Sequence, residues 1–403
     1  MTRRQGTEPT DSVRETGDPA STTTVLERRI RSRIERKGPL PFAEFMALAL
    51  TDPEGGYYTS AAARPTPGGD YLTAPELHPI FGQCLALQVV EVWERLGRPV
   101  PFILREYGAG AGTLALAVLE EIEREAPRLA EGILYEPVEL NRHRLEELRE
   151  RFAARGMAPK IREADEGIPA GVVVANEYLD ALPVHRLVLR RAGLRERYVD
   201  WREGQFVEVE GPVSDPGLEV AFRDLEVTSP DVVVEIRPEV RRWVEVLAAQ
   251  LAAGVVIVVD YGGSSAELFG PHQPEGTVVG YRGHRVAPSA LADPGSQDLT
   301  AHVDFSDLLS AARRQGFDVL GETSQAAFLM GCGLEGLLRR AIADPETTLQ
   351  GLLVLRSAIR RLLDPRLLGG FRVAIFGRGI SPVPLLRGLA YRLPERATAA
   401  GGA

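Results

Sequence analysis

The chain has 403 residues, of which 44% are hydrophobic and 26% are charged, which is the composition of an ordinary globular protein with a large core. Its formal net charge of −9 argues against an overall basic surface of the kind that attracts nucleic acid. Cys84 and Cys332 belong to no CxxC pair, and the six histidines show no HExxH or HxH pattern, so we expect no metal site.

Neither a membrane span nor a targeting segment is expected. No apolar run reaches the roughly 18 residues that a span needs. Residues 1–24 are polar, mix both charge signs and lack the apolar core of a signal peptide, so we interpret them as a disordered tail, and 386–403 likewise. Two lone thiols in so long a chain favour a reducing compartment, and we expect a cytoplasmic protein.

The first structured part, residues 25–97, is expected to be a helical N-terminal region that includes an active-site cover loop. The helical pattern "VLERRIRSRIERKG" stops at a Gly-Pro pair, and "PFAEFMALAL" starts a second helix. The segment "GGDYLTAPELHPIFGQ" (68–83) then concentrates Asp70, Thr73 and Glu76 ahead of a helix. We expect this loop to cover a site; an ordered connection with helix-capping residues is the alternative.

From residue 98 to 385 short apolar strands alternate with helices. Such alternation predicts a parallel, doubly wound sheet. A weak strand is expected near "KIREAD". The clearer expected strands lie at 101–107, 133–139, 171–176, 255–260 and 371–379.

Two inserted segments interrupt this pattern. Residues 184–236 read as short antiparallel strands with turns, and residues 325–368 read as helical. Segments 276–286 and 298–305 are expected to be loops, and Asp304 is expected to cap the helix that follows it.

The stretch "REYGAGAGTL" follows the first of these strands and places Gly108, Gly110 and Gly112 after an acid, Glu106. The loop lacks the lysine of a Walker motif, and its GxGxG spacing differs from the dinucleotide pattern GxGxxG. An acid is a poor neighbour for pyrophosphate but a good one for an ammonium group, which S-adenosylmethionine carries. The pattern therefore favours S-adenosylmethionine; a tight packing turn and an NAD oxidoreductase are the alternatives.

A second acid is expected to hold the cofactor's ribose. Glu139 ends the strand at 133–139 and follows Gly112 by 27 residues, which places it at the same edge of a parallel sheet. Thr113, at the end of the glycine loop, and Asn176, at the end of the strand at 171–176, complete the expected cofactor contacts.

The segment "NEYLDALPVHR" offers two carboxylates, Glu177 and Asp180, at the same crevice. A guanidinium acceptor arrives charged, because its pKa exceeds about 12, and carboxylates can orient it through paired hydrogen bonds. We expect Glu177 and Asp180 to handle the acceptor, with Asp70 and His302 as weaker catalytic candidates. The alternatives are that Asp180 caps a turn, that Asn176 bonds the backbone, and that His302 is a buried, hydrogen-bonded histidine.

Taken together, these segments resemble the MidA-like family of class I methyltransferases, whose mitochondrial member is a protein arginine methyltransferase that assists assembly of respiratory complex I. They occur in family order and cover most of the chain. The matching segments are "DPEGGYYT", "GGDYLTAPELHPIFGQ", "REYGAGAGTL", "VELNRHRL", "NEYLDALPVHR", "VDYGG", "GTVVGYRGHRV", "DLTAHVDF" and "FRVAIFGRG".

The resemblance implies an α/β, Rossmann-like class I methyltransferase fold that binds S-adenosylmethionine through the glycine loop and Glu139. It also implies that the loop from Asp70 to Glu76 and the segment from Asn176 to Asp180 frame the active site. We therefore expect a methyltransferase that acts on arginine in a protein substrate. A non-catalytic assembly chaperone and a small-molecule methyltransferase are the alternatives, and the sequence leaves the oligomeric state open, a homodimer included.

Overall fold

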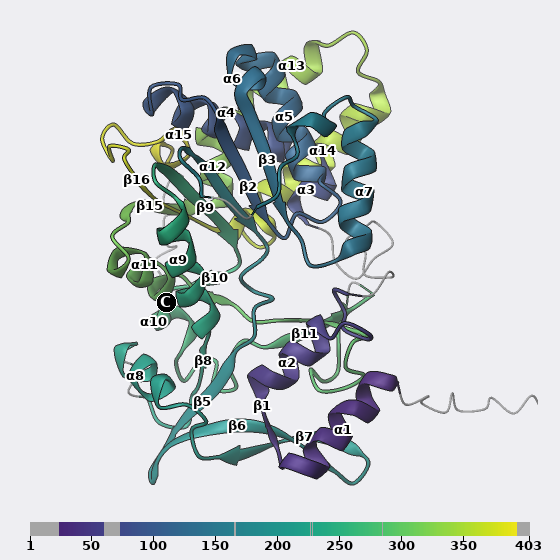
Figure 1. The fold of residues 1–403 in the computed structure, drawn as a ribbon, viewed down its shortest axis with the longest axis vertical. Coiled ribbons are helices and arrows are strands. Elements are labelled where there is room, and N and C mark those ends of the chain that lie inside the picture. Colours follow the sequence, from purple (N-terminus) through teal and green to yellow (C-terminus); the bar gives the residue numbers. More distant parts are fainter. Residues whose placement is uncertain are drawn as a thin grey trace, which may run out of the picture.

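The computed structural model contains two large sheets, a six-stranded one in the upper half of Figure 1 and a five-stranded one in the lower half, besides two smaller ones. Asp70, His284, residues 1–23 and residues 393–403 lie outside the part of the chain that the structure describes. The described ranges are 24–59, 73–164, 167–225, 227, 229–283 and 285–392.

The sequence predicted a parallel sheet, but the six-stranded sheet is mixed. Its spatial order is β15 (Asp318–Ser324), β16 (Arg372–Arg378), β9 (Gly254–Asp260), β4 (Gly171–Asn176), β2 (Phe102–Tyr107) and β3 (Ile133–Val138). The last four strands are parallel, whereas β16 runs antiparallel to both of its neighbours. The helical segment after β15 returns the chain to the end where β15 finished, with Ser324 opposite Arg372, so β16 must run back.

The strand expected near "KIREAD" does not form. Only Ile161 makes a bridge, to Tyr135, and a short 3-10 turn, η1 (Ala158–Lys160), precedes it. The polar residues after Ile161 offer no apolar face to bury, and Arg162 instead pairs with the buried Glu136.

Helices cover both faces of this sheet (Figure 1). Alternate residues of β2 point to opposite faces of the sheet. Phe102 and Leu104 belong to a core with α4 and α5, and Ile103 belongs to a core with α9 and α11. Both faces are therefore buried, as a doubly wound sheet requires. The helices of the first face are α4 (Ile80–Arg95), α5 (Thr113–Glu125), α7 (Arg142–Ala153), α12 (Gln325–Gly331), α13 (Leu334–Ala343) and α14 (Leu349–Leu363), and those of the second are α9 (Pro238–Gln250) and α11 (Phe305–Arg314).

The five-stranded sheet is antiparallel and joins the N-terminal region to the inserted strands. Phe45 of α2 packs against Phe206 of β7, with ring centroids 5.5 Å apart. This contact joins α2, which precedes the glycine loop, to β7, which follows the glycine loop by about a hundred residues. The elements are β1 (Leu40–Pro41), β5 (His185–Arg190), β6 (Gly193–Arg202), β7 (Gln205–Gly211), β8 (Val233–Ile236), α1 (Val25–Lys37), α2 (Phe42–Thr51) and α8 (Pro216–Asp224).

Strands also occur where we expected loops. Segments 276–286 and 298–305 contribute β11 (Val279–Arg282), β12 (Arg285–Val286) and β13 (Asp298–Thr300) to a three-stranded sheet. Asp304 caps α11 as predicted, accepting from the backbone N–H of Ser306 at 2.9 Å. These strands are too short for a periodic signal. A second small pair is β10 (Gly262–Gly263) with β14 (Val303–Asp304).

The predicted C-terminal tail begins too early, because α15 (Arg387–Ala390) packs against α12. No helix within the described ranges has both the length and the apolar character to cross a bilayer. The remaining short elements are α3 (Ala74–Leu77), α6 (Pro127–Gly132), α10 (Ser265–Leu268) and η2 (Leu368–Gly370).

Candidate active site

The three glycines of the loop after β2 have left-handed backbone conformations but different surroundings. Their φ angles are +70° at Gly108, +52° at Gly110 and +75° at Gly112. A Cβ atom on Gly112 would lie 2.9 Å from Leu148 Cγ, and one on Gly108 would lie 3.3 Å from Tyr178. Nothing lies within 4 Å of a Cβ on Gly110. Gly112 thus permits close packing, whereas Gly110 leaves open space for a ligand.

This contrast predicts different defects for two substitutions. Gly112→Ala should lower the free energy of unfolding by about 2–4 kcal/mol, because it adds both left-handed strain and a steric clash. Gly110→Ala should cost about 1–2 kcal/mol from strain alone but weaken cofactor binding tenfold or more. Thermal unfolding and calorimetric titration with S-adenosylhomocysteine measure the two effects. Equal destabilisation by both variants would contradict this assignment.

A cavity of about 490 Å³ opens at the carboxyl ends of β2, β3 and β4, where a doubly wound sheet places its ligands. Four of its described lining residues are carboxylates, Glu76, Glu106, Glu139 and Glu177, and one, Arg144, is a cation. The described wall therefore carries more acidic groups than cations, and these can ionise beside positively charged ligands. The other described lining residues are Thr51, Tyr57, Tyr58, Thr73, Pro75, Gly108, Ala109, Gly110, Ala111, Thr113, Leu114, Val138, Leu140, Asn141, Asn176, Tyr178, Ala181 and Leu182.

Glu106 is the most enclosed of these carboxylates. It is 6% exposed and accepts a hydrogen bond from the hydroxyl of Tyr135 at 2.6 Å. Burial raises the pKa of Glu106 to about 8; the hydrogen bond from Tyr135 opposes this rise and the charge of Glu139 adds to it. A cation placed beside Glu106 would favour its ionised form.

Glu139 lies against the glycine loop. Its two carboxylate oxygens accept hydrogen bonds from the backbone N–H groups of Gly110 and Asn141, each at 2.7 Å. Thr113 also lines the cavity, and its hydroxyl accepts from the guanidinium of Arg151 at 2.8 Å. The structure thus brings these two predicted cofactor residues to one wall.

Glu177 lies just beyond β4 in a strained conformation, with φ of +49°. Its Oε1 accepts from the backbone N–H of Ala74 at 3.1 Å and from the side-chain amide of Asn176 at 3.2 Å. Burial raises the pKa of Glu177 to about 7; the bond from Ala74 opposes the rise and Asp180 adds to it. Strain in a non-glycine residue at a ligand cavity is typical of functional sites.

Asn176 keeps a buried side-chain oxygen, Oδ1, that has no hydrogen-bond partner in the structure. Such groups are rare in folded proteins, and this residue lines the cavity. A ligand donor can satisfy this oxygen, which agrees with the predicted role of Asn176 in cofactor binding.

The structure does not bring Asp180 to the described cavity wall. Its carboxylate accepts from the Tyr261 hydroxyl at 2.6 Å, and burial raises its pKa. The backbone N–H groups of Leu179 and Asp180 both donate to Asp260, at 3.0 and 3.2 Å. This turn directs Asp180 into the protein, so Glu177 alone of the predicted carboxylate pair lines the site.

His302 is also absent from the described cavity wall. Its ring packs edge-on against Tyr261 at 5.3 Å, and its backbone N–H donates to the Thr277 hydroxyl at 2.8 Å. Burial lowers the pKa of His302. His302 is half-buried, and the hydrogen bonds described for it are made by its backbone N–H and carbonyl. Asp70 lies outside the described residues, so its position is not assigned.

Several residues of the cavity wall, among them its tyrosines and its described cation, were not predicted from the sequence. Tyr57 and Tyr58 reach it from the N-terminal region, Tyr178 from the segment after β4, and Asn141 and Arg144 from the start of α7. The segments "DPEGGYYT" and "VELNRHRL" carried the family resemblance, which was the available signal. Nothing in their local pattern showed that they meet.

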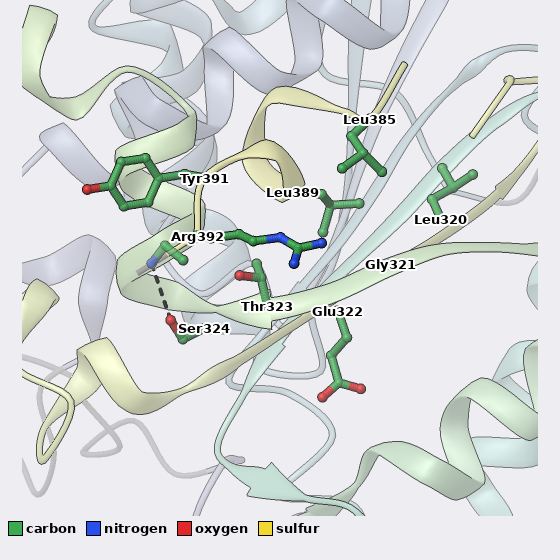
Figure 2. A pocket seen from close by; sticks show the side chains of 10 residues that line it. Leu320, Gly321, Glu322, Thr323, Ser324, Leu385, Leu389, Tyr391 and Arg392 are labelled. Carbon is green, nitrogen blue, oxygen red and sulfur yellow. Dashed lines mark hydrogen bonds between the residues drawn. The ribbon is translucent and has the colours of Figure 1, made fainter. Parts of the chain in front are cut away.

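A second cavity, of about 440 Å³, lies between β15 and the segment after Leu385 (Figure 2). Leu320 and Leu389 line it, together with Glu322, Thr323 and Arg392. It lies at the antiparallel edge of the sheet and has no glycine loop. The cavity at the parallel strand ends is therefore the candidate active site.

S-adenosylmethionine fits this active-site cavity by three observations. The carboxylate of Glu106 matches the cofactor's ammonium group, the open space at Gly110 admits its amino-acid part, and the unpartnered oxygen of Asn176 awaits a donor. Within the described ranges, no group of three His, Cys, Asp or Glu side chains is arranged to hold a metal ion.

Comparisons with known proteins agree with this cofactor. A family model described as "S-adenosyl-L-methionine-dependent methyltransferase" matches residues 84–323. The mitochondrial protein arginine methyltransferase NDUFAF7 homolog of Drosophila melanogaster is 31% identical over 85% of this chain and 82% of its own, and the human NDUFAF7 is 28% identical over 78% and 75%. A Burkholderia thailandensis protein crystallised with S-adenosyl-homocysteine is 31% identical, with a TM-score of 0.78 over 91% of this chain and 94% of that one.

Proposed function

The chain belongs to the S-adenosyl-L-methionine-dependent methyltransferase family, and we propose that its acceptor is an arginine side chain of a protein. The observation that carries this proposal is that Glu76 and Glu177 line the described cavity wall in addition to Glu106 and Glu139, the two carboxylates assigned to the cofactor. A guanidinium is permanently charged and is bound best by carboxylates in enclosed surroundings. The names of the mitochondrial relatives, protein arginine methyltransferases, support the same acceptor.

Glu177 is the residue best placed to hold that acceptor. It lines the cavity next to Asn176, and the hydrogen bond from Ala74 ties it to the short helix α3, which also carries Glu76. Two carboxylates from different segments can therefore engage one guanidinium.

The chemistry supplied by bound S-adenosylmethionine is a methyl group on a positively charged sulfur. The acceptor nitrogen gains this methyl group and loses one proton, so the guanidinium keeps its single positive charge. Glu177, with a pKa near 7, can receive the departing proton and pass it to solvent. Most of the rate enhancement would come from orienting the acceptor nitrogen in line with the methyl–sulfur bond.

The role of Asp180 in this proposal is to position Glu177. Its bond with Tyr261 and the bonds to Asp260 fix the turn that follows Glu177. The strained backbone of Glu177 is held by this turn and by its own N–H, which donates to the Val259 carbonyl at 2.8 Å, whereas Ala74 holds its carboxylate.

The test is methyl transfer to paired peptides. Purified protein with isotopically labelled S-adenosylmethionine is offered arginine-containing peptides and the same peptides with each arginine replaced by lysine, and mass spectrometry locates the label. We expect label on arginine alone, and a rate of labelling at least about 100-fold lower with Glu177→Gln. Label on small metabolites but on no peptide would favour a small-molecule methyltransferase. Tight binding of S-adenosylhomocysteine without any labelled product, in peptides or in a lysate, would favour an assembly chaperone.

A further inference from the structure

Asn141 contacts three parts of the molecule at once. We propose that Asn141 is a positioning residue that couples the N-terminal region to the cofactor site, by holding Glu139 and Tyr58 at the same time. The proposal depends on the cofactor assignment but not on the identity of the acceptor.

The first contact is with the predicted ribose ligand. The backbone N–H of Asn141 donates to Glu139 Oε1 at 2.7 Å, while the other oxygen of Glu139 accepts from Gly110. The orientation of the Glu139 carboxylate therefore depends on where the backbone of Asn141 lies.

The second contact is with α7. The side-chain oxygen of Asn141 accepts from the backbone N–H groups of His143 at 3.0 Å and Arg144 at 3.3 Å, and so caps this helix. Asn141 is 4% exposed, so these bonds are shielded from water. Arg144 lines the cavity, and its position at the start of α7 is fixed by the same capping bond to Asn141.

The third contact reaches the N-terminal region. The side-chain amide of Asn141 donates to the backbone carbonyl of Tyr58 at 2.8 Å. The hydroxyl of Tyr58 in turn donates to Asp298 of β13 at 2.6 Å, and its backbone N–H donates to Leu50 at 2.8 Å. A continuous hydrogen-bonded path therefore runs from β13 through Tyr58 and Asn141 to Glu139.

This path has a consequence for cofactor release. Tyr57 and Tyr58 line the cavity from the N-terminal side, so the bond from Asn141 to Tyr58 fixes part of the wall that a bound cofactor would contact. Movement of this wall breaks the hydrogen bond that the side-chain amide of Asn141 donates to the Tyr58 carbonyl. Loss of this bond should therefore speed dissociation more than it slows association.

Two substitutions separate this role from helix capping. Asparagine, aspartate and serine are nearly equivalent as N-caps. Asn141→Asp and Asn141→Ser therefore keep the cap of α7 but lose the amide that reaches Tyr58. Aspartate introduces a negative charge near Glu139 and serine does not, so agreement between the two variants excludes a charge effect.

The experiment measures the dissociation rate of S-adenosylhomocysteine by stopped-flow, together with the thermal midpoint, in the full chain. For both variants we expect dissociation about tenfold faster, with a midpoint within about 3 °C of the native protein. Dissociation rates within twofold of native would overturn the proposal, and so would faster dissociation matched by a large fall in the midpoint. Neither readout uses an acceptor, so failure here is distinct from failure of the arginine proposal.

Tyr58→Phe provides an independent measurement. It removes the hydroxyl bond to Asp298 but keeps the backbone carbonyl that Asn141 contacts. If the path acts as a unit, Tyr58→Phe should also speed dissociation, and its effect should shrink in combination with Asn141→Asp. Fully additive effects would contradict a connected path.

Discussion

Glu177→Gln is expected to lower kcat for methyl transfer by about 100- to 1000-fold while leaving the affinity for S-adenosylhomocysteine within about threefold. Glutamine has nearly the same shape, and its side-chain oxygen can still accept from Ala74, so the local structure should survive. It lacks the negative charge that orients a guanidinium and the basicity that receives its proton. Steady-state kinetics with an arginine peptide and calorimetry with S-adenosylhomocysteine measure the two quantities.

Glu131→Gln is the matched control for this change. Glu131 is an exposed residue of α6 and does not line the cavity, so its substitution should leave kcat unchanged. A glutamine at position 177 that kept more than a tenth of native kcat would remove Glu177 from the catalytic role. A loss of cofactor affinity equal to the loss of kcat would instead make it a cofactor residue.

Asp180→Asn should behave differently from Glu177→Gln, because Asp180 is buried among Tyr261 and Asp260. Replacing one buried, hydrogen-bonded carboxyl should cost about 1–3 kcal/mol of unfolding free energy. Asp180→Asn should lower kcat less than Glu177→Gln does, because it acts on kcat only by displacing Glu177. The two variants, compared by urea unfolding and kinetics, therefore test whether positioning and catalysis are divided between these residues.

The cofactor side of the site could be predicted because its signals are local. Gly108, Gly110 and Gly112 follow a strand at every second position, and glycine permits the left-handed backbone that all three adopt. Glu106 and Glu139 end neighbouring parallel strands, and such ends always meet at one edge of a sheet. The order of strands and the glycine spacing were therefore enough to predict that these residues lie at one cavity.

The acceptor side could not be placed in the same way. Asp180 follows Glu177 by only three residues, yet a turn bonded to Asp260, eighty residues away, directs it elsewhere. Tyr58 is held at the wall by bonds with Asn141 and Asp298, which follow it by 83 and 240 residues. Contacts of this kind depend on tertiary packing, and no periodicity in either segment encodes them.

Glu106 should make cofactor binding depend on pH, and Glu106→Gln should remove that dependence. In the protein without ligand the pKa of Glu106 is about 8, so at lower pH its carboxyl group is protonated. A ligand ammonium favours the ionised form, so binding below pH 8 releases a proton. The affinity for S-adenosylhomocysteine should therefore rise, by up to about tenfold per unit, as the pH increases from 6 to 8, and then level off.

Glu106→Gln should bind S-adenosylhomocysteine about 10- to 100-fold more weakly than the native protein at pH 8, because it lacks a charge-assisted bond to the ammonium group. At pH 6 the two proteins should differ little, since the native carboxyl group is then neutral. Calorimetry in buffers of different ionisation enthalpy reports the released proton directly. Titration of the ligand's own amine would appear in both proteins, so only the difference between them is assigned to Glu106. Parallel pH profiles for the two proteins would show that Glu106 does not face the ammonium group.

The unfolding free energy offers a second, ligand-free readout of the same group. Burial raises the pKa of Glu106 from its ordinary value of 4.5 to about 8, so the unfolded chain loses this proton before the folded protein does. The folded state is therefore favoured fully below about pH 4.5, and this contribution is lost progressively as the pH rises to about 8. Glu106→Gln should flatten this part of the stability profile in urea unfolding. Because cofactor binding favours the ionised form, saturating S-adenosylhomocysteine should flatten it in the native protein as well, which links the proton and the ligand to one carboxyl group.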